Sequence, residues 1–316
     1  MNKQIEEIIK ASNSVAVFFH INPDGDAIGS SLALKLALNQ LNKQVDIYSC
    51  DFDPKEIEFL DGKNIITKIT NKKYDLAIVL DCPDIKRIGT MFSVYKNCTN
   101  VVNIDHHLFN QNFTKYKLVD TTKSSTCELI YDLIKQLNLE ITKDIARCLY
   151  TGLATDSGCF MYNISKNLHK IAGELVAKFD DVDNINFLLF REKRKEEVSL
   201  YAEAINKLEY HVNDRLAITN ITLKDLEKHN AKQTDTIGLV FLLSGLKDVD
   251  VVCVVCEEKE GQYKVAFRSK STNVCAIAQL FGGGGHKLAS GCKIYGSKNS
   301  VKKKIIAKVQ EYLCTV

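Results

Sequence analysis

The chain has 316 residues, which is enough for two domains of ordinary size, each with its own core. It is 45% hydrophobic and 26% charged, a balance typical of a soluble globular protein. The formal net charge of +3 and the pI near 8.2 are too mild for a protein that wraps long nucleic acids, but they suit small anionic ligands bound in one local pocket.

The first part of the chain alternates apolar strands with helices. Strands are predicted at residues 15–20, 45–48, 76–80 and 101–104, and a helix at residues 27–41, where apolar residues recur at helical spacing. Such nearly continuous apolar strands are typical of a parallel sheet that is covered on both faces. Residues 125–179 are predicted to be mostly helical, and Ser124, Ser125 and Thr126 before Glu128 are predicted to cap a helix start.

The second part of the chain has the pattern of a separate, smaller domain. Residues 196–210 predict a helix, so residues 191–211 are interpreted as a helical linker between domains at 1–190 and 212–316. Strands are then predicted at 216–221, 249–256 and 263–267 and near Ile294, with helices at 235–243, at 273–280 and at the C-terminus. The expected fold class is α/β, with a parallel-sheet N-terminal domain and a smaller α/β C-terminal domain.

Eleven cysteines raise the question of disulfides. Their number is odd, their spacing is irregular and most lie in apolar runs, so free buried thiols in a reducing cytosol are expected. Cys253 and Cys256 lie three residues apart in a predicted strand, so they are expected to point to opposite faces and not to chelate zinc. The first ten residues predict an amphipathic helix rather than a signal peptide, and residues 236–246 are too short to span a bilayer. We expect a cytoplasmic protein without a membrane anchor.

Polar residues gather where the predicted strands of the first domain end. Any one of them is usually a turn or capping residue, but the whole set in this order rarely arises that way. The five carboxylates among them would repel one another without bound cations, and mixed carboxylate and imidazole ligands suit Mn²⁺ or a similar ion. The candidate ligands exceed one coordination sphere, which indicates two metal ions and metal-assisted hydrolysis at phosphorus. The set comprises His20, Asp24, Asp26, Asp81, Asp105, His106, His107 and Asp156.

A second candidate site lies in the C-terminal domain. Four glycines precede His286 and Lys287, and glycine backbone N–H groups can approach an anion closely. A helix starting after the run would add a favourable dipole for phosphate. Arg268, at the end of the preceding strand, can hold a phosphate in a bidentate way, and Ser269 and Lys270 follow it.

These motifs together resemble those of a known family. The segment from His20 to Asp26, the strand ending at Asp81, the Asp105-His106-His107 triplet and Thr155-Asp156 resemble the four motifs of the DHH phosphoesterases. Arg268-Ser269-Lys270 and the glycine run resemble the DHH-associated domain that follows, so the resemblance covers nearly the whole chain. Within the superfamily the chain is most similar to the nanoRNase and pAp phosphatase branch. That branch degrades very short oligoribonucleotides and removes the 3′ phosphate of adenosine 3′,5′-bisphosphate (pAp).

The resemblance also implies a role for each residue. His20, Asp24 and Asp81 would hold one metal, and Asp26, Asp81, His106 and Asp156 the other, with Asp81 bridging. Asp105 would orient His106, and His107 would face the scissile phosphate as a donor or proton carrier, so His107, Asp81 and Asp105 are the catalytic candidates. The active site would lie in the cleft between the domains. The substrate-binding candidates are Arg268, Ser269, Lys270, Gly282, Gly283, Gly284, Gly285 and His286.

The expected enzyme is therefore a metal-dependent exonuclease and nucleotidase with a role in RNA degradation. Its cofactors would be two divalent ions, Mn²⁺ ahead of Mg²⁺ or Co²⁺, and its ligand a short single-stranded RNA or a nucleotide. No membrane and no obligate protein partner are expected, and a homodimer is compatible with the sequence. Two alternatives remain: a cyclic-dinucleotide or pApA phosphodiesterase, and a non-catalytic nucleotide- or single-strand-binding module.

Overall fold

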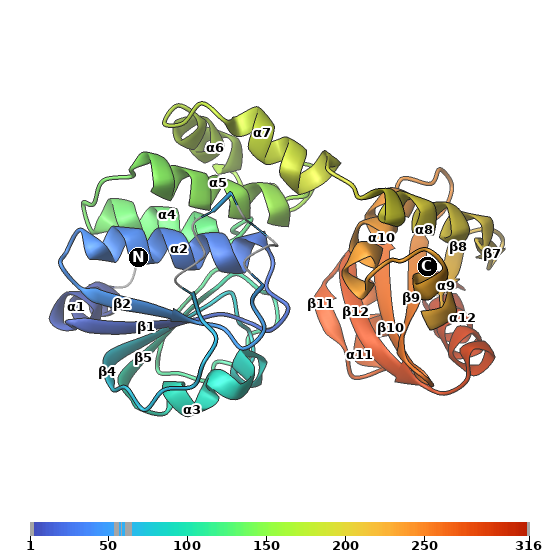
Figure 1. Ribbon diagram of the computed structural model, residues 1–316, viewed down its shortest axis with the longest axis horizontal. Coiled ribbons are helices and arrows are strands. Elements are labelled where there is room, and N and C mark those ends of the chain that lie inside the picture. Colours follow the sequence, from blue (N-terminus) through green and yellow to red (C-terminus); the bar gives the residue numbers. More distant parts are fainter. Residues whose placement is uncertain (1–2, 54–56, 58, 61–64, 315–316) are drawn as a thin grey trace. The chain divides into compact units, whose positions relative to one another are not determined.

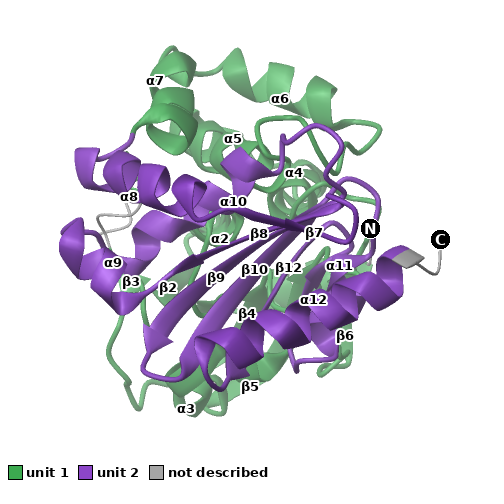
Figure 2. Ribbon diagram, turned by 90° about the vertical axis from the view of Figure 1, so that its right-hand side faces the viewer, with its two compact units in different colours: residues 1–192 green, residues 193–316 purple. Residues whose placement is uncertain are grey.

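The computed structural model describes residues 3–53, 57, 59, 60 and 65–314 of the chain, so Met1 and Asn2 of the predicted N-terminal helix lie outside it. The chain divides into two compact units, Met1–Glu192 and Lys193–Val316, which Figure 2 shows in different colours. Residues 193–211, interpreted from the sequence as a linker, belong to the second unit. Each unit is an α/β layer structure built on one six-stranded sheet, so the predicted fold class is confirmed.

The sheet of the first unit is parallel throughout. Its order is β3-β2-β1-β4-β5-β6, so the direction in which the strands are added reverses between β1 and β4. The four strands predicted from apolar runs are present, whereas the short edge strands β3 and β6 were not predicted. The strands are β1 (Ser14–Phe18), β2 (Gln44–Tyr48), β3 (Ile65–Ile66), β4 (Tyr74–Leu80), β5 (Cys98–Asp105) and β6 (Tyr116–Val119).

Helices cover both faces of this sheet. Alternate residues of β1 enter two different cores: Val15 and Val17 pack beneath the larger helical layer, and Ala16 and Phe18 pack on the other face. Figure 1 shows α2, α4 and α5 stacked over one face and α3 on the other. The α-helices are α1 (Lys3–Ala11), α2 (Gly25–Asn39), α3 (Phe92–Tyr95), α4 (Thr126–Gln136), α5 (Lys143–Asp156), α6 (Leu168–Val176) and α7 (Val182–Asn186), with a 3₁₀ helix at Ile85–Met91 and a π-helical turn at Phe187–Arg191.

The sheet of the second unit is mixed. Its order is β11-β12-β10-β9-β8-β7, and β8 and β9 are its parallel pair. The helix predicted over residues 196–210 ends at Asn206, and Tyr210 instead lies in β7, which pairs with β8. Sheet pairing thus overrides the local helical pattern there. The strands are β7 (Glu209–His211), β8 (Leu216–Ile221), β9 (Val251–Lys259), β10 (Gln262–Ser269), β11 (Gly284–His286) and β12 (Ala289–Tyr295).

Helices also cover both faces of the second sheet, as Figure 2 shows. One face packs against α11 and α12, and the other against α8, α9 and α10. Cys253 lies in the first of these cores and Cys256 in the second, so the two thiols point to opposite faces as predicted. The helices are α8 (Lys195–Asn206), α9 (Leu223–Lys228), α10 (Ile237–Leu243), α11 (Val274–Gln279) and α12 (Lys298–Cys314), with a 3₁₀ helix at Gln233–Thr236.

The described cysteines and helices bear on two further expectations. Every cysteine whose side chain the structure describes is a free thiol, and most of these thiols are buried, as predicted. Within the described ranges, each helix is too short or too polar to cross a membrane.

Candidate metal centre

Three strands of the first unit are followed by polar residues at one edge of the sheet. His20 lies two residues beyond β1, Asp81 directly follows β4, and Asp105 is the last residue of β5. β1 and β4 are the neighbours between which the strand order reverses. Ligands of open α/β sheets bind beyond the carboxyl ends of the strands at such a reversal. The topology therefore brings these side chains to the expected place for a ligand site.

Two helices supply the remaining carboxylates. Asp24 is the N-cap residue of α2, and its Oδ1 accepts hydrogen bonds from the backbone N–H groups of Asp26 and Ala27, both at 3.0 Å. Asp156, predicted to lie at a strand end like the other members of the set, is instead the last residue of helix α5. Helices α2 and α5 pack against each other, which brings the first turn of one beside the last turn of the other.

Acidic and histidine side chains of the first unit form several groups with the dimensions of metal sites, one of them made of Asp81, Asp105 and His107. Two others contain the ligands that the resemblance implies. The first consists of His20, Asp24 and Asp81, and the second of Asp26, His106 and Asp156. Within each group the potential ligand atoms all lie within 4.8 Å of one another. Ligand atoms this close can share one ion. The structure thus brings together the two sets that the resemblance assigns to two ions.

Asp81 belongs to the first group and also faces the second. Its Oδ2 is 3.4 Å from Nε2 of His20, and its Oδ1 is 3.7 Å from Nε2 of His106. Oδ1 also lies 3.5 Å from Nδ1 of His107, so one oxygen faces His20 and the other faces His106 and His107. Its backbone is left-handed, with φ of 51°, a conformation that aspartate tolerates better than most residues.

Backbone carbonyls orient two of the histidines. Nδ1 of His20 lies 2.8 Å from the carbonyl oxygen of Ile21, and Nδ1 of His106 lies 3.3 Å from that of Lys123. Because a carbonyl can only accept a hydrogen bond, Nδ1 is the protonated nitrogen in each ring. Nε2 of the neutral ring then keeps its lone pair and faces carboxylates, as a metal ligand must.

Asp105 is fully buried and contacts the two histidines in different ways. Its Oδ1 accepts a hydrogen bond from the backbone N–H of His106 at 2.9 Å and lies 2.7 Å from Nδ1 of His107. Its contact with His106 is therefore to the backbone, and the imidazole that it orients is that of His107. Asn110 Nδ2 donates to Asp105 Oδ2 at 2.6 Å and to Asn103 Oδ1 at 2.8 Å. Neither asparagine could be identified from the sequence, because nothing in their spacing marks this contact.

The start of helix α4 holds Asp26. Ser125 is the N-cap residue, and its hydroxyl accepts a hydrogen bond from the backbone N–H of Glu128, so the predicted cap is confirmed. The backbone N–H groups of Thr126 and Cys127 donate to the Asp26 carboxylate at 2.7 and 2.8 Å. A helix N-terminus stabilises a carboxylate in this position. This contact joins segments about 100 residues apart, so no local sequence pattern indicates it.

In the second unit, Arg268 and His286 lie on neighbouring strands of one sheet. Arg268 of β10 and His286 of β11 are both paired with Ala289 of β12, which runs between the two strands. Residues directly opposite each other in a sheet point to the same face. The two basic side chains therefore share one face, about 10 Å apart at the backbone given the spacing of strands.

The glycine run differs from its predicted form. The backbone N–H groups of Gly282 and Gly283 donate to the carbonyls of Gln279 and Ala278, at 3.0 and 2.9 Å, and so end helix α11. These two N–H groups are therefore already used within the second unit, whereas the sequence predicted that they would be free to bind an anion. No helix follows the run, because its last residues form β11, which pairs with β12. A Cβ at Gly283 would lie 2.1 Å from the carbonyl oxygen of Gly291, so close strand packing requires glycine there.

Ser269 and Lys270 have hydrogen bonds within the second unit. Ser269 Oγ accepts from the backbone N–H groups of Ser271 and Thr272, at 3.2 and 2.8 Å. Lys270 Nζ donates to the carbonyl of Leu246. These contacts shape the turn after β10, which supports a structural role beside any contact with substrate.

Comparison with known proteins decides the family. The model of the DHH family N-terminal domain matches residues 14–153, and the model of the DHHA1 domain matches residues 213–314. The chain belongs to the DHH family of phosphoesterases. The first match includes every residue of the two groups except Asp156, and the DHHA1 match includes Arg268 and the glycine run.

Several known proteins match this chain over nearly its whole length. The bifunctional oligoribonuclease and PAP phosphatase NrnA of Thermus thermophilus is 29% identical, covering 98% of this chain and 93% of its own. The protein of the same name from Bacillus subtilis is 26% identical and covers 93% and 94%. The crystal structure of an exopolyphosphatase-related protein from Bacteroides fragilis is 27% identical, with a TM-score of 0.90 over 98% and 95% of the two chains.

The crowding of the DHH site shifts the pKa values of its acids. Burial, followed by the negative charge of Asp81, raises the pKa of Asp26 to about 7. Burial and then the charge of Asp26 raise the pKa of Asp156 well above its usual value. For Asp81 burial opposes ionisation, but the three nearby imidazoles outweigh it and hold the pKa well below its ordinary range. Carboxylates this close need cations or protons between them.

Divalent ions fit this site, and DHH phosphoesterases use divalent metals. Carboxylate oxygens and imidazole nitrogens are ligands that Mn²⁺ and similar ions accept. Oδ2 of Asp156 is buried and accepts no hydrogen bond from the residues that the structure describes. It lies 3.2 Å from Nε2 of His106. A proton on the imidazole or a cation bound by both atoms would satisfy this contact.

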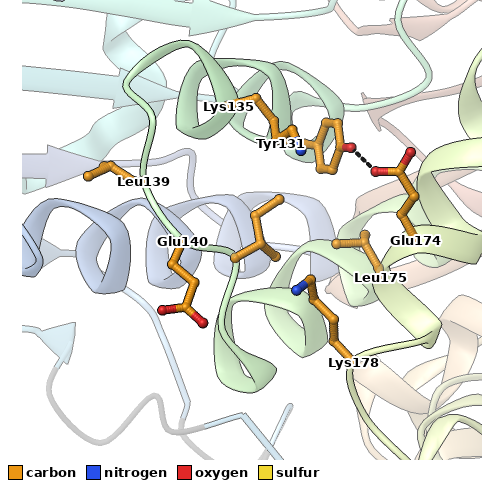
Figure 3. Close-up of a pocket in the computed structure, with 8 residues that line it drawn as sticks. Tyr131, Lys135, Leu139, Glu140, Glu174, Leu175 and Lys178 are labelled. Carbon is orange, nitrogen blue, oxygen red and sulfur yellow. Dashed lines mark hydrogen bonds between the residues drawn. The ribbon is translucent and has the colours of Figure 1, made fainter.

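The first unit, which contains the DHH domain, also has a pocket away from the candidate metal ligands. It has a volume of about 220 Å³ and lies among α4, α6 and the segment before α5. Figure 3 shows the Tyr131 hydroxyl donating to the Glu174 carboxylate across it. None of the eight residues that line the pocket belongs to either candidate site. The Tyr131 hydroxyl is already paired with Glu174, so we assign the pocket no ligand.

Proposed function

We propose that the protein is a two-metal phosphoesterase that hydrolyses very short oligoribonucleotides and the 3′ phosphate of pAp. The observation that supports it most is the position of Asp81, which turns one carboxylate oxygen toward each of two groups of ligands. A pair of ions joined in this way suits in-line displacement at phosphorus, because it can stabilise both the attacking and the leaving oxygen.

The substrate class is supported by the relatives named as oligoribonuclease and PAP phosphatase, which match this chain over nearly all of its length. The mild net charge agrees with it, because a short substrate needs few phosphate contacts. Mn²⁺ is the proposed ion, and the mixed oxygen and imidazole ligands support it.

The protein's own residues would bind the ions and move a proton. His20, Asp24 and Asp81 would hold one ion, and Asp26, His106, Asp156 and Asp81 the other. Bound ions of this kind supply a nucleophile at neutral pH and neutralise charge on the phosphate.

His107 is the proposed proton carrier. Its Nδ1 lies 2.7 Å from Asp105 Oδ1, which accepts that nitrogen's hydrogen and leaves Nε2 to exchange a proton with a phosphate oxygen. Burial disfavours the charged ring, but Asp105 and Asp81 outweigh this effect and raise the pKa of His107 above its usual value. The ring is thereby favoured as a proton donor.

A panel of small substrates tests the proposed function. pAp, a diribonucleotide, a pentaribonucleotide, a longer single strand, pApA and cyclic di-AMP are each incubated with Mn²⁺, with Mg²⁺ and with a chelator. We expect Mn²⁺-dependent release of phosphate from pAp and of mononucleotides from the shortest RNAs, with none in chelator. Preferred cleavage of pApA or the cyclic dinucleotide would replace the proposed substrate. Metal binding without any cleavage would favour the non-catalytic alternative.

Arg268→Ala tests the proposed role of the DHHA1 domain. Losing a bidentate phosphate contact is expected to raise KM about tenfold or more for the shortest substrates while leaving the Mn²⁺ content unchanged. Lys264→Ala is the matched control, since Lys264 is an exposed cation on the same strand and face, about 13 Å away along β10. Loss of bound Mn²⁺ from the Arg268 variant would contradict the assignment of Arg268 to the substrate.

A further inference from the structure

Thr126 contacts carboxylates of both proposed metal groups. Its side chain is fully buried at the first position of helix α4. Its backbone N–H donates to Asp26 Oδ2 at 2.7 Å, and its hydroxyl donates to Asp81 Oδ1 at 3.1 Å. The Asp81 oxygen that receives this hydrogen bond is the one that faces His106. Thr126 therefore links the bridging carboxylate to the group formed by Asp26, His106 and Asp156.

The turn that carries Thr126 also orients His106. The carbonyl of Lys123 accepts from Nδ1 of His106, and Lys123 Nζ in turn donates to Glu128 Oε1 at 3.1 Å and to Asp132 Oδ2 at 2.6 Å. Glu128 is buried, and its Oε2 accepts from the backbone N–H of Ser124 at 2.9 Å. These bonds tie the turn at Lys123 and Ser124 to helix α4.

The other group is oriented by different elements. His20 is oriented by the carbonyl of its neighbour Ile21, and Asp24 by the backbone of helix α2, which it caps. Apart from Asp81, the ligands that α4 and the turn before it contact through hydrogen bonds are Asp26 and His106, which belong to one group. A change at the start of α4 should act on the two groups unequally.

We propose that Thr126 is a positioning residue that orients Asp81 Oδ1 for the ion held by Asp26, His106 and Asp156. This inference rests on the proposed two-metal function. Without the hydroxyl, Asp81 Oδ1 loses one of the contacts that hold it on the side of His106 and His107, so the carboxylate can tilt about its contact with Nε2 of His20. The ion beside His20 would then bind normally and the other ion more weakly.

Titration of metal-free protein with Mn²⁺ by calorimetry tests this proposal. Thr126→Val removes the hydroxyl and keeps the backbone N–H and nearly the same volume, and Thr126→Ser is the matched control that restores the hydroxyl. We expect two ions per wild-type chain. In Thr126→Val one of the two ions should bind about tenfold less tightly than in wild type, as loss of a hydrogen bond to a charged group implies. The other ion should keep its wild-type affinity. Thr126→Ser should stay within about threefold of wild type.

The outcomes separate this inference from the proposed function. Two ions bound equally tightly by wild type and Thr126→Val would overturn the role of Thr126 alone. Fewer than two ions in wild type would overturn the two-metal site, and this inference with it. Equal weakening of both ions would also contradict the inference, because it predicts a difference between them. Thermal melting checks that each variant folds, and Thr126→Ala replaces Thr126→Val if the latter does not.

Discussion

Replacing Asp81 with alanine is expected to lower the hydrolysis of pAp and short RNA by at least about 1,000-fold, because it removes a ligand from both ions at once. Asp81→Asn is the sharper variant. Asparagine keeps the size of the side chain and tolerates the left-handed backbone at this position, so the loss reports the charge rather than the fold. Steady-state kinetics in Mn²⁺, with bound metal measured on the same samples, gives the result.

Asp75→Asn is the control for Asp81→Asn. Asp75 lies on the same strand, β4, near its other end, where its carboxylate accepts hydrogen bonds from the backbone N–H groups of Asn13 and Ser14. Its loss should cost some stability but leave turnover within about twofold, since it lies far from the carboxyl edge. Wild-type turnover by Asp81→Asn would contradict the two-metal site.

Replacing Gly152 with alanine is expected to damage both the fold and the site. In most helix interiors this change stabilises a protein by roughly 0.5–1 kcal/mol. Here the new Cβ would lie 2.2 Å from Cys127 Sγ and 2.7 Å from Asp26 Oδ1, where α5 packs closely on its neighbours. Relieving this overlap should lower the free energy of unfolding by about 1–3 kcal/mol and displace Asp26 from its ion. Chemical denaturation and Mn²⁺ titration measure the two effects.

Gly173→Ala is the matched control for that variant. Gly173 lies inside helix α6, and a Cβ there would meet nothing within 4 Å. The same substitution should therefore leave metal binding unchanged and raise stability by up to about 1 kcal/mol. If Gly152→Ala were as stable as wild type and bound Mn²⁺ normally, the close packing of α2, α4 and α5 would not be what holds Asp26.

The clustering of His20, Asp81 and Asp105 in the candidate site could be predicted from the sequence because these residues follow or end apolar strands. The runs before His20, Asp81 and Asp105 are long enough to mark parallel strands, and parallel strands direct their ends to one edge. The same pattern predicted the α/β class of both units. The short strands β3 and β6 were missed because two to four residues carry too little periodicity.

Other features depend on contacts between distant segments, which no local pattern encodes. Thr126 was interpreted as part of a helix cap, and its contacts with Asp26 and Asp81 arise only when α4 packs at the sheet edge. Asn110 reaches Asp105 through the shape of the turn after β5. The glycine run suggested free N–H groups, but the end of α11 and the pairing with β12 use this segment for structure.

Diffraction from crystals soaked in Mn²⁺, recorded where manganese scatters anomalously, tests the central claim most directly. The account predicts two anomalous peaks in the DHH unit, with one Asp81 oxygen bound at each. One peak should contact His20 and Asp24, and the other Asp26, His106 and Asp156. A single peak, or two peaks that Asp81 does not join, would contradict a shared two-metal centre.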